Sequence, residues 1–203
     1  MIINNNLELT PKIAKMLKDG KVGAIATDTV YGLVCDASNK IAIDKIVNLK
    51  NRDLNKSFVI FAKNLDFFSK IAKIHDNIKK IANIFWPGAL TIVAKKQINF
   101  AEFIDKNISN NQNIALRIPD NSFFIKLLDE FNGFLVVTSA NISKKDPALN
   151  VKQIKRYFAN NLDFIVEGSD FSSCASTIVE FEDDRIKILR SGDIKKQELL
   201  KYL

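Results

Sequence analysis

The sequence predicts an α/β protein, in which short buried strands form a sheet with helices on both faces. Short apolar runs alternate along the chain with amphipathic stretches, which is typical of this class. The four prolines all stand at plausible boundaries between elements. The 203 residues, 47% of them hydrophobic, can bury a large core, and no repeat or linker divides them. We therefore expect a single domain spanning residues 1–203.

The sequence up to Phe85 predicts four helices and two strands. Thr10 as N-cap and Pro11 at the first helical position predict a helix that ends near Gly20. Ser38 is expected to cap a second helix, whose apolar face recurs at helical spacing up to Lys50. Continuous apolar runs predict strands at Val22–Ala26 and Ser57–Ala62, and further helices are expected at Leu65–Ala72 and Asn77–Phe85.

The sequence after Phe85 predicts more strands than helices. Pro119 ends an apolar strand and is followed by a helical pattern. The expected strands are Ala89–Ala94, Ile114–Ile118, Phe134–Thr138, Asp163–Val166, Ser176–Glu180 and Arg185–Leu189. The expected helices are Ser122–Phe131, Val151–Phe158 and a short one from Lys195.

Composition excludes several classes of function. No apolar run approaches the length of a membrane span, and the amino terminus lacks a signal-peptide pattern. Cys35 and Cys174 stand far apart, which favours reduced thiols in a cytoplasmic protein. With His75 as the sole histidine, neither a metal site nor a Ser-His-Asp triad is expected. The net charge of +7 permits anionic ligands such as nucleotides or RNA.

Polar side chains gather where the predicted strands end. A loop predicted over Thr27–Leu33 follows the first strand, and other strand or helix ends bear Lys50, Arg52, Arg117, Ser139, Asn141, Ser176 and Arg190. Ligand groups gather at such ends in α/β sheets, although turn chemistry and helix dipoles also explain hydroxyls and lysines there. Arg117 needs an anion if it is buried, either an internal carboxylate or a substrate one. Common phosphate-loop motifs are absent. The residues indicate a cationic, hydroxyl-lined cleft for an anionic small molecule.

The same residues form an ordered set of motifs. These are Thr27-Asp28-Thr29-Val30-Tyr31-Gly32-Leu33, Lys50-Asn51-Arg52, Trp86-Pro87-Gly88-Ala89-Leu90-Thr91, Leu116-Arg117-Ile118-Pro119, Ser139-Ala140-Asn141 and Ser176-Thr177 with Leu189-Arg190-Ser191-Gly192. In this order and spacing the chain resembles the YrdC-like family in its short form, from about residue 8 to residue 194. The resemblance implies a twisted mixed β-sheet flanked by helices, with a positively charged concave surface.

The resemblance also implies an activity. Members of this kind join L-threonine, bicarbonate and ATP, accompanied by Mg²⁺, into threonylcarbamoyl-AMP and pyrophosphate. Separate tRNA threonylcarbamoyl transferase proteins then use that product to make N6-threonylcarbamoyladenosine in tRNA. No protein nucleophile is implied, so the protein would act by positioning and charge stabilisation.

Matching motifs imply a role for each residue. Lys50 and Arg52 would hold the ATP phosphates and serve catalysis, and Ser139, Asn141 and Arg190 would contact the nucleotide. Arg117 would pair with the threonine carboxylate, and Thr27, Thr29, Tyr31 and Ser176 would form the threonine pocket. The sequence departs from the family pattern at Ala26, Asp53, Ser57, Phe61 and Lys144.

Two alternatives remain open at the level of sequence. One is a YrdC-like paralogue that acts on another carbamoyl substrate. The other is a module that binds double-stranded RNA or tRNA, whose contacts would show steep salt dependence. Loss of ATP turnover on Lys50→Ala would favour the synthase.

Overall fold

The computed structural model describes residues 1–52, 57–105, 108, 112–168, 174–182 and 185–202. Within them the chain forms one mixed sheet of ten strands. The strands are β1 (Ile2–Ile3), β2 (Gly23–Ala26), β3 (Tyr31–Asp36), β4 (Val59–Phe61), β5 (Leu90–Lys95), β6 (Asn113–Arg117), β7 (Leu135–Ser139), β8 (Phe164–Val166), β9 (Thr177–Glu182) and β10 (Arg185–Arg190). The expected α/β class is confirmed.

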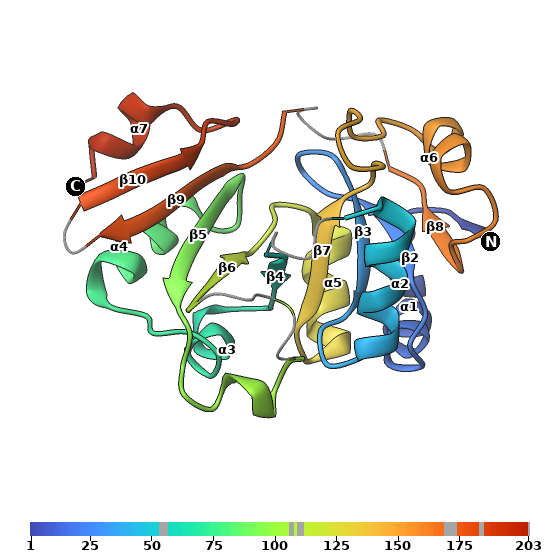
Figure 1. The fold of residues 1–203 in the computed structure, drawn as a ribbon, viewed down its shortest axis with the longest axis horizontal. Coiled ribbons are helices and arrows are strands. Elements are labelled where there is room, and N and C mark those ends of the chain that lie inside the picture. The colour runs from blue at the N-terminus through green and yellow to red at the C-terminus, as the bar shows by residue number, and fades with distance from the viewer. Residues whose placement is uncertain (53–56, 106–107, 109–111, 169–173, 183–184, 203) are drawn as a thin grey trace.

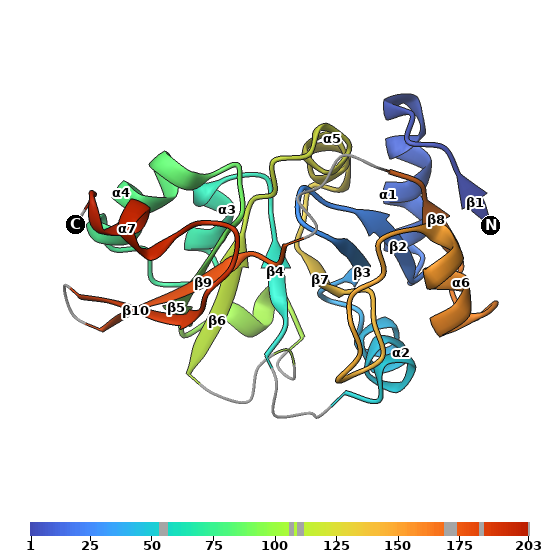
Figure 2. The same ribbon diagram turned by 90° about the horizontal axis from the view of Figure 1, so that it is seen from above.

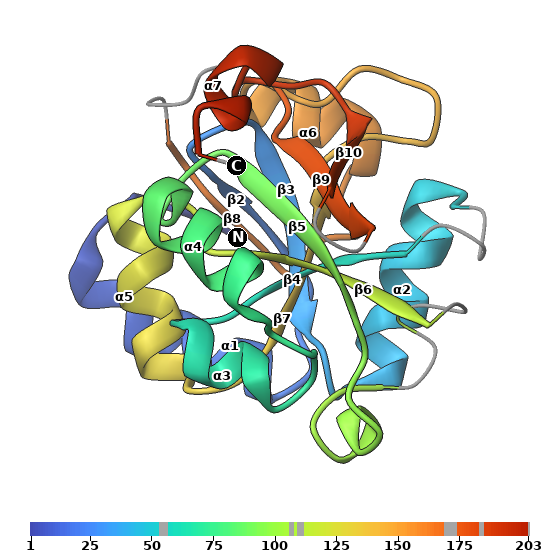
Figure 3. The same ribbon diagram turned by 90° about the vertical axis from the view of Figure 1, so that its left-hand side faces the viewer.

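The strand order is β1-β8-β2-β3-β7-β4-β6-β5-β9-β10. Four neighbouring pairs are parallel (β1/β8, β2/β8, β4/β6 and β5/β9), and the other five are antiparallel. Because β1 and β10 are the two edges, the amino and carboxyl termini lie at opposite ends of the sheet (Figure 1). The central strands cross one another at a visible angle when the sheet is seen from its side (Figure 3), as expected for a twisted mixed sheet.

Helices cover both faces of the sheet. They are α1 (Thr10–Lys18), α2 (Lys40–Lys50), α3 (Leu65–Ser69), α4 (Asp76–Phe85), α5 (Ser122–Phe131), α6 (Val151–Phe158) and α7 (Lys196–Leu200). In the view from above, α1 and α5 lie on one side of β2, β3 and β7, and α2 lies on the other side (Figure 2). Among the described residues, none of the helices has both the length and the apolar character required to cross a bilayer.

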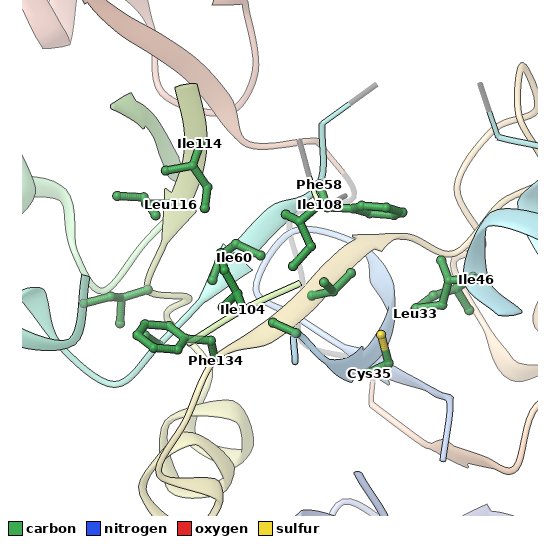
Figure 4. Packing of buried hydrophobic residues seen from close by; sticks show 14 of the residues in the cluster. Leu33, Cys35, Ile46, Phe58, Ile60, Ile104, Ile108, Ile114, Leu116 and Phe134 are labelled. Carbon is green, nitrogen blue, oxygen red and sulfur yellow. The ribbon is translucent and has the colours of Figure 1, made fainter. Parts of the chain in front are cut away.

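Two clusters of buried apolar side chains hold these layers together. The larger runs along the sheet from Leu33 and Cys35 to Ile114 and Leu116 (Figure 4). The smaller joins α1 and α5 to the sheet and includes an edge-to-face contact between Phe61 and Phe124, whose ring centroids lie 5.4 Å apart. Burial of these side chains supplies the main free energy of folding, at about 25 cal/mol per Å² of apolar surface.

Several local expectations were wrong. Tyr31–Asp36 is a strand, whereas the sequence placed Thr27–Leu33 in one loop. A tight turn joins β2 to β3, with the Thr27 amide donating to the Val30 carbonyl oxygen at 3.2 Å. The two-residue strand β1 was not predicted, and the helix expected to reach Ala72 ends at Ser69.

Two expected helix caps were also wrong. Asn39, not Ser38, caps α2, because its side chain accepts from the Ala42 amide. Ser38 binds the Asp36 carboxylate instead. Thr10 lies inside its helix, because a 3₁₀ turn over Leu7–Leu9 precedes it. Asp53, one of the departures from the family pattern, lies outside the described residues.

Candidate functional site

A cavity of about 390 Å³ lies among strand ends from both halves of the sheet. Eight of the ten residues predicted from the sequence line it: the hydroxyl-bearing Thr27, Thr29, Tyr31, Ser139 and Ser176, and the guanidinium-bearing Arg52, Arg117 and Arg190. Lys50 and Asn141 lie next to the cavity, in contact with Ser139. The structure therefore brings all ten predicted residues together.

A larger hollow of about 1110 Å³ lies around the start of α4 and the ends of β5 and β9. It is lined by charges of both signs, such as Lys73, Lys95, Asp76 and Glu180, and by none of the predicted residues. The smaller cavity is the better candidate, because like charges and hydroxyls converge on it.

Lys50 ends α2 and is almost completely buried. Its ammonium group donates to the carbonyl oxygen of Ser139, to the carbonyl oxygen of Asn141 at 2.9 Å and to the side-chain oxygen of Asn141 at 2.8 Å. Burial and the nearby charge of Arg52 lower the pKa of Lys50 to about 7. The residue therefore fastens the end of α2 to the loop that follows β7, and its charge is sensitive to a neighbouring anion.

Arg52 is placed beside the cavity by a left-handed residue, Asn51, at which α2 ends. Its guanidinium donates to the Ser57 carbonyl oxygen at 2.7 Å and to the Thr138 hydroxyl at 3.3 Å, and it lies 4.6 Å from the centroid of the Phe58 ring. The aromatic face and the two oxygens hold the charge at the cavity wall.

The loop after β7 is fixed by side-chain hydrogen bonds. The Ser139 hydroxyl donates to the side-chain oxygen of Asn141 at 2.6 Å. The side-chain amide of Asn141 in turn donates to the Lys145 carbonyl oxygen at 2.5 Å. The Ser143 amide donates to the Lys50 carbonyl oxygen at 2.8 Å, which ties the loop to α2 a second time. Asn141 thus shapes the loop, and Ser139 presents its surface to the cavity.

Arg117 ends β6 and forms an ion pair with Asp28 at 2.5 Å. Their side chains are only 5% and 13% exposed, respectively. The same guanidinium donates to the Gly88 carbonyl oxygen at 2.9 Å and to the Thr29 hydroxyl at 3.0 Å. Burial lowers the pKa of Arg117, and Asp28 opposes that shift. The sequence predicted that a buried Arg117 would pair with either an internal carboxylate or a substrate carboxylate. In the structure its partner is an internal carboxylate, that of Asp28.

Thr27 and Tyr31 use their hydroxyl groups within the protein. The Thr27 hydroxyl donates to the Val30 carbonyl oxygen at 2.8 Å and accepts from the Thr29 amide at 3.0 Å. The Tyr31 hydroxyl both donates to and accepts from the backbone of Gly168, each at 2.9 Å. Burial raises the pKa of Tyr31. Both hydroxyls hold neighbouring backbone in place at the cavity wall.

Ser176 precedes β9 and is bound by two side chains. Arg190, at the end of β10, donates to the Ser176 hydroxyl at 3.0 Å and to its carbonyl oxygen at 2.8 Å and 3.1 Å. The hydroxyl of buried Thr91 lies 2.8 Å from that of Ser176. Arg190 is exposed to solvent overall, but these bonds hold its guanidinium against the cavity.

Two further residues of this site, Asp28 and Thr91, were not predicted from the sequence. Both belong to the ordered motifs, Asp28 between two threonines and Thr91 in an apolar strand. They belong to the site because of hydrogen bonds to residues more than eighty positions away along the chain, Arg117 and Ser176.

The described residues contain no group of three His, Cys, Asp or Glu side chains that could hold a metal ion. The Asp28 carboxylate contacts the cavity wall through Arg117, which binds it. One carboxylate that is already paired is too little to hold a magnesium ion by itself. These residues fit a magnesium ion whose ligands are mainly phosphate oxygens and water.

The chain is similar to known proteins over most of its length. A family model for Sua5, YciO and YrdC proteins, described as telomere recombination, matches residues 15–192. A protein of Methanocaldococcus jannaschii named putative threonylcarbamoyl-AMP synthase is 34% identical, over 96% of this chain and 92% of its own length. The threonylcarbamoyl-AMP synthase of Pyrococcus abyssi is 26% identical over 94% of this chain, which spans 56% of that protein.

Solved structures are similar over nearly the whole chain. Sua5 of P. abyssi, crystallised with L-threonine, superposes with a TM-score of 0.92 and 25% identity, covering 100% of this chain and 61% of that one. YciO of Escherichia coli superposes with a TM-score of 0.84 at 18% identity, covering 98% of each chain, and supports the fold alone.

Proposed function

Because this chain belongs to the Sua5/YciO/YrdC family, we propose that it is a threonylcarbamoyl-AMP synthase. The observation that carries the proposal is the convergence of Arg52, Arg117 and Arg190 with several hydroxyl groups on one cavity. Such a wall suits substrates that bring carboxylate, bicarbonate and phosphate charges together. The names of the relatives and the threonine complex of the P. abyssi protein support the choice of substrate.

The reaction needs no protein nucleophile. The amine of L-threonine attacks the carbon of bicarbonate, and loss of water gives a carbamate. A carbamate oxygen then attacks the α-phosphorus of ATP, and the bond to the β-phosphate breaks, releasing pyrophosphate. Both steps bring anions together, so the enzyme's work is to position them and to offset their charge.

The residues divide this work as their positions suggest. Lys50 and Arg52 lie together at the end of α2, where they would meet the phosphates and stabilise charge on the leaving pyrophosphate. Ser139, Asn141 and Arg190 would contact the nucleotide.

Arg117 has five N–H groups, three of which bind Gly88, Thr29 and Asp28. The remaining two, one on each terminal nitrogen, would donate to the threonine carboxylate. Thr29 and Ser176, with Thr27 and Tyr31 shaping the wall, would complete the threonine pocket.

Further parts of the proposal concern the surroundings of the reaction. Magnesium would accompany ATP and neutralise part of the phosphate charge. The product would pass to separate tRNA threonylcarbamoyl transferase proteins, and the basic net charge supports contact with tRNA. Cys35 and Cys174 are not joined in a disulfide, which supports a place in the cytoplasm.

Release of pyrophosphate from ATP tests the proposal. We expect purified protein to release it with Mg²⁺ only when L-threonine and bicarbonate are both present, and Lys50→Ala or Arg52→Ala to remove that release. Lys40→Ala, an exposed lysine on the same helix, is the matched control and should retain it.

Two other results would contradict the synthase. Binding of ATP without release that depends on both co-substrates would favour a paralogue with another carbamoyl substrate. A protein that fails to bind ATP, but binds double-stranded RNA with steep salt dependence, would favour the RNA-binding module.

A further inference from the structure

The hydroxyl groups of Thr91 and Ser176 form a buried pair whose hydrogen-bond direction can be deduced. Their oxygens lie 2.8 Å apart, and either one could donate on distance alone. Both residues line the cavity, but Thr91 in β5 has no exposed surface (0%), whereas 5% of Ser176 is exposed. The two residues therefore differ in what else their protons can reach.

Thr91 must be the donor. Ser176 is the sole hydrogen-bond partner of the Thr91 hydroxyl in the described part of the chain. If Ser176 donated to Thr91, the Thr91 proton would be left buried without an acceptor, which is costly. If Thr91 donates to Ser176, the Thr91 proton has an acceptor. The Ser176 proton then faces the cavity, where a ligand or water can accept it.

The acceptor capacity of the Ser176 hydroxyl is then filled. A hydroxyl oxygen accepts through two lone pairs and donates one proton. One lone pair receives the Arg190 guanidinium at 3.0 Å, and the other receives Thr91. Ser176 can therefore meet a substrate only as a donor.

We propose that Thr91 is a positioning residue that fixes the Ser176 hydroxyl as a donor toward an anionic oxygen of the substrate. The inference rests on the proposed function, because it needs a carboxylate or phosphate oxygen in this cavity. Arg190 and Arg117 beside Ser176 favour such an anion there. Because Thr91 has no exposed surface, we infer that it acts on the substrate through Ser176.

A double-mutant cycle tests this role. Thr91→Val removes the hydroxyl and keeps the shape of the side chain, and Ser176→Ala removes the donor. We expect Ser176→Ala to lower kcat/KM by about ten- to a hundredfold, as for a hydrogen bond to a charged group, and Thr91→Val to lower it by about three- to tenfold. In the Ser176→Ala background, Thr91→Val should change kcat/KM by less than about twofold, because its partner is gone.

Thr91→Ser is the matched control. It keeps the hydroxyl and should restore most of the activity that Thr91→Val loses. Thermal unfolding of each variant shows that it is folded, and Thr91→Ala replaces Thr91→Val if the latter does not fold. Separate KM values for L-threonine and ATP show whether the carboxylate or a phosphate accepts the proton, and a rise in either supports the inference.

The outcomes are distinct. Additive effects of the two substitutions, or a Thr91→Ser variant as defective as Thr91→Val, would overturn the inference while the synthase stands. A folded wild-type protein without threonine-dependent pyrophosphate release would overturn the proposed function and this inference with it.

Discussion

Lys50 shows how a single buried charge can connect ligand binding to pH. Its pKa of about 7 results from burial and from Arg52. Phosphate beside the ammonium group would favour the charged form and raise that pKa. In the unliganded protein, the folded state binds fewer protons at Lys50 than the unfolded chain does between about pH 7 and 10.5. Through this residue, folding stability therefore rises with pH across that window.

The same linkage predicts proton uptake on nucleotide binding. At about pH 8, binding of MgATP should take up about one proton, and affinity should fall as the pH rises above about 7. Calorimetric titration in buffers of different ionisation enthalpy measures the uptake. Lys50→Met should abolish it and Lys40→Met should retain it. Uptake that persists in Lys50→Met would mean that another group is responsible.

Asp28 is the counter-charge of a buried arginine, and its loss should be costly. Asp28→Asn keeps the size of the side chain but removes the ion-pair partner of Arg117. We expect it to lower the free energy of unfolding by about 3 kcal/mol, measured by urea denaturation. Asp44→Asn removes the partner of Lys40 in an exposed ion pair and should cost less than about 1 kcal/mol. Equal losses in the two variants would show that Asp28 does not compensate a buried charge.

At the scale of elements, the turn after β10 is held against the start of β9 by close backbone contact. A Cβ atom at Gly192 would lie 2.2 Å from the Ala175 carbonyl oxygen and 2.6 Å from the Thr177 amide nitrogen. The Gly192 amide also donates to the Thr177 hydroxyl at 3.1 Å. A side chain at this position must displace the backbone that places Ser176 in the cavity.

Gly192→Ala should therefore impair both stability and activity. We expect a loss of about 3 kcal/mol in the free energy of unfolding, since overpacking against backbone cannot be relieved by a rotamer change. Pyrophosphate release should fall with it. Ser191→Ala, at the exposed neighbouring position, should change neither quantity measurably. A stable and active Gly192→Ala enzyme would show that this contact does not determine the position of Ser176.

Elements with a continuous apolar run or a clear helical period were predictable from the sequence, and those ordered by distant partners were not. The buried strands β4 to β7 and helices α4 to α6 fall close to their expected ranges. Strand β3 was missed because it begins at Tyr31-Gly32, directly after a polar turn that the Thr27 hydroxyl organises. The edge strand β1 is too short for any periodic signal and pairs only with distant β8.

At the scale of the whole molecule, the cavity is assembled from strands of both halves of the sheet. Thr29 and Ser139 come from the β2, β3 and β7 side, and Arg117 and Ser176 come from the β6 and β9 side. The sequence predicted this convergence because strand ends of an α/β sheet gather ligand groups. It could not predict Asp28 or Thr91, because hydrogen-bond partners so far apart along the chain appear only after folding.

A ligand that bridges both halves should stabilise the molecule as one unit. MgATP at a hundred times its Kd should raise the free energy of unfolding by about 2.7 kcal/mol. Thermal unfolding should remain a single transition that moves as a whole, because contacts to the ligand come from both sides. Two transitions, of which only one moves with ATP, would contradict a site shared between the halves.

The identity of the adenylate tests the central claim most directly. The protein is incubated with ATP, Mg²⁺, L-threonine and ¹³C-bicarbonate. The products are then separated, and their masses are measured by mass spectrometry. The account predicts threonylcarbamoyl-AMP with the ¹³C label in its carbamoyl carbon, formed in step with pyrophosphate. An unlabelled adenylate, or one that forms from carbamoyl phosphate without threonine, would contradict it.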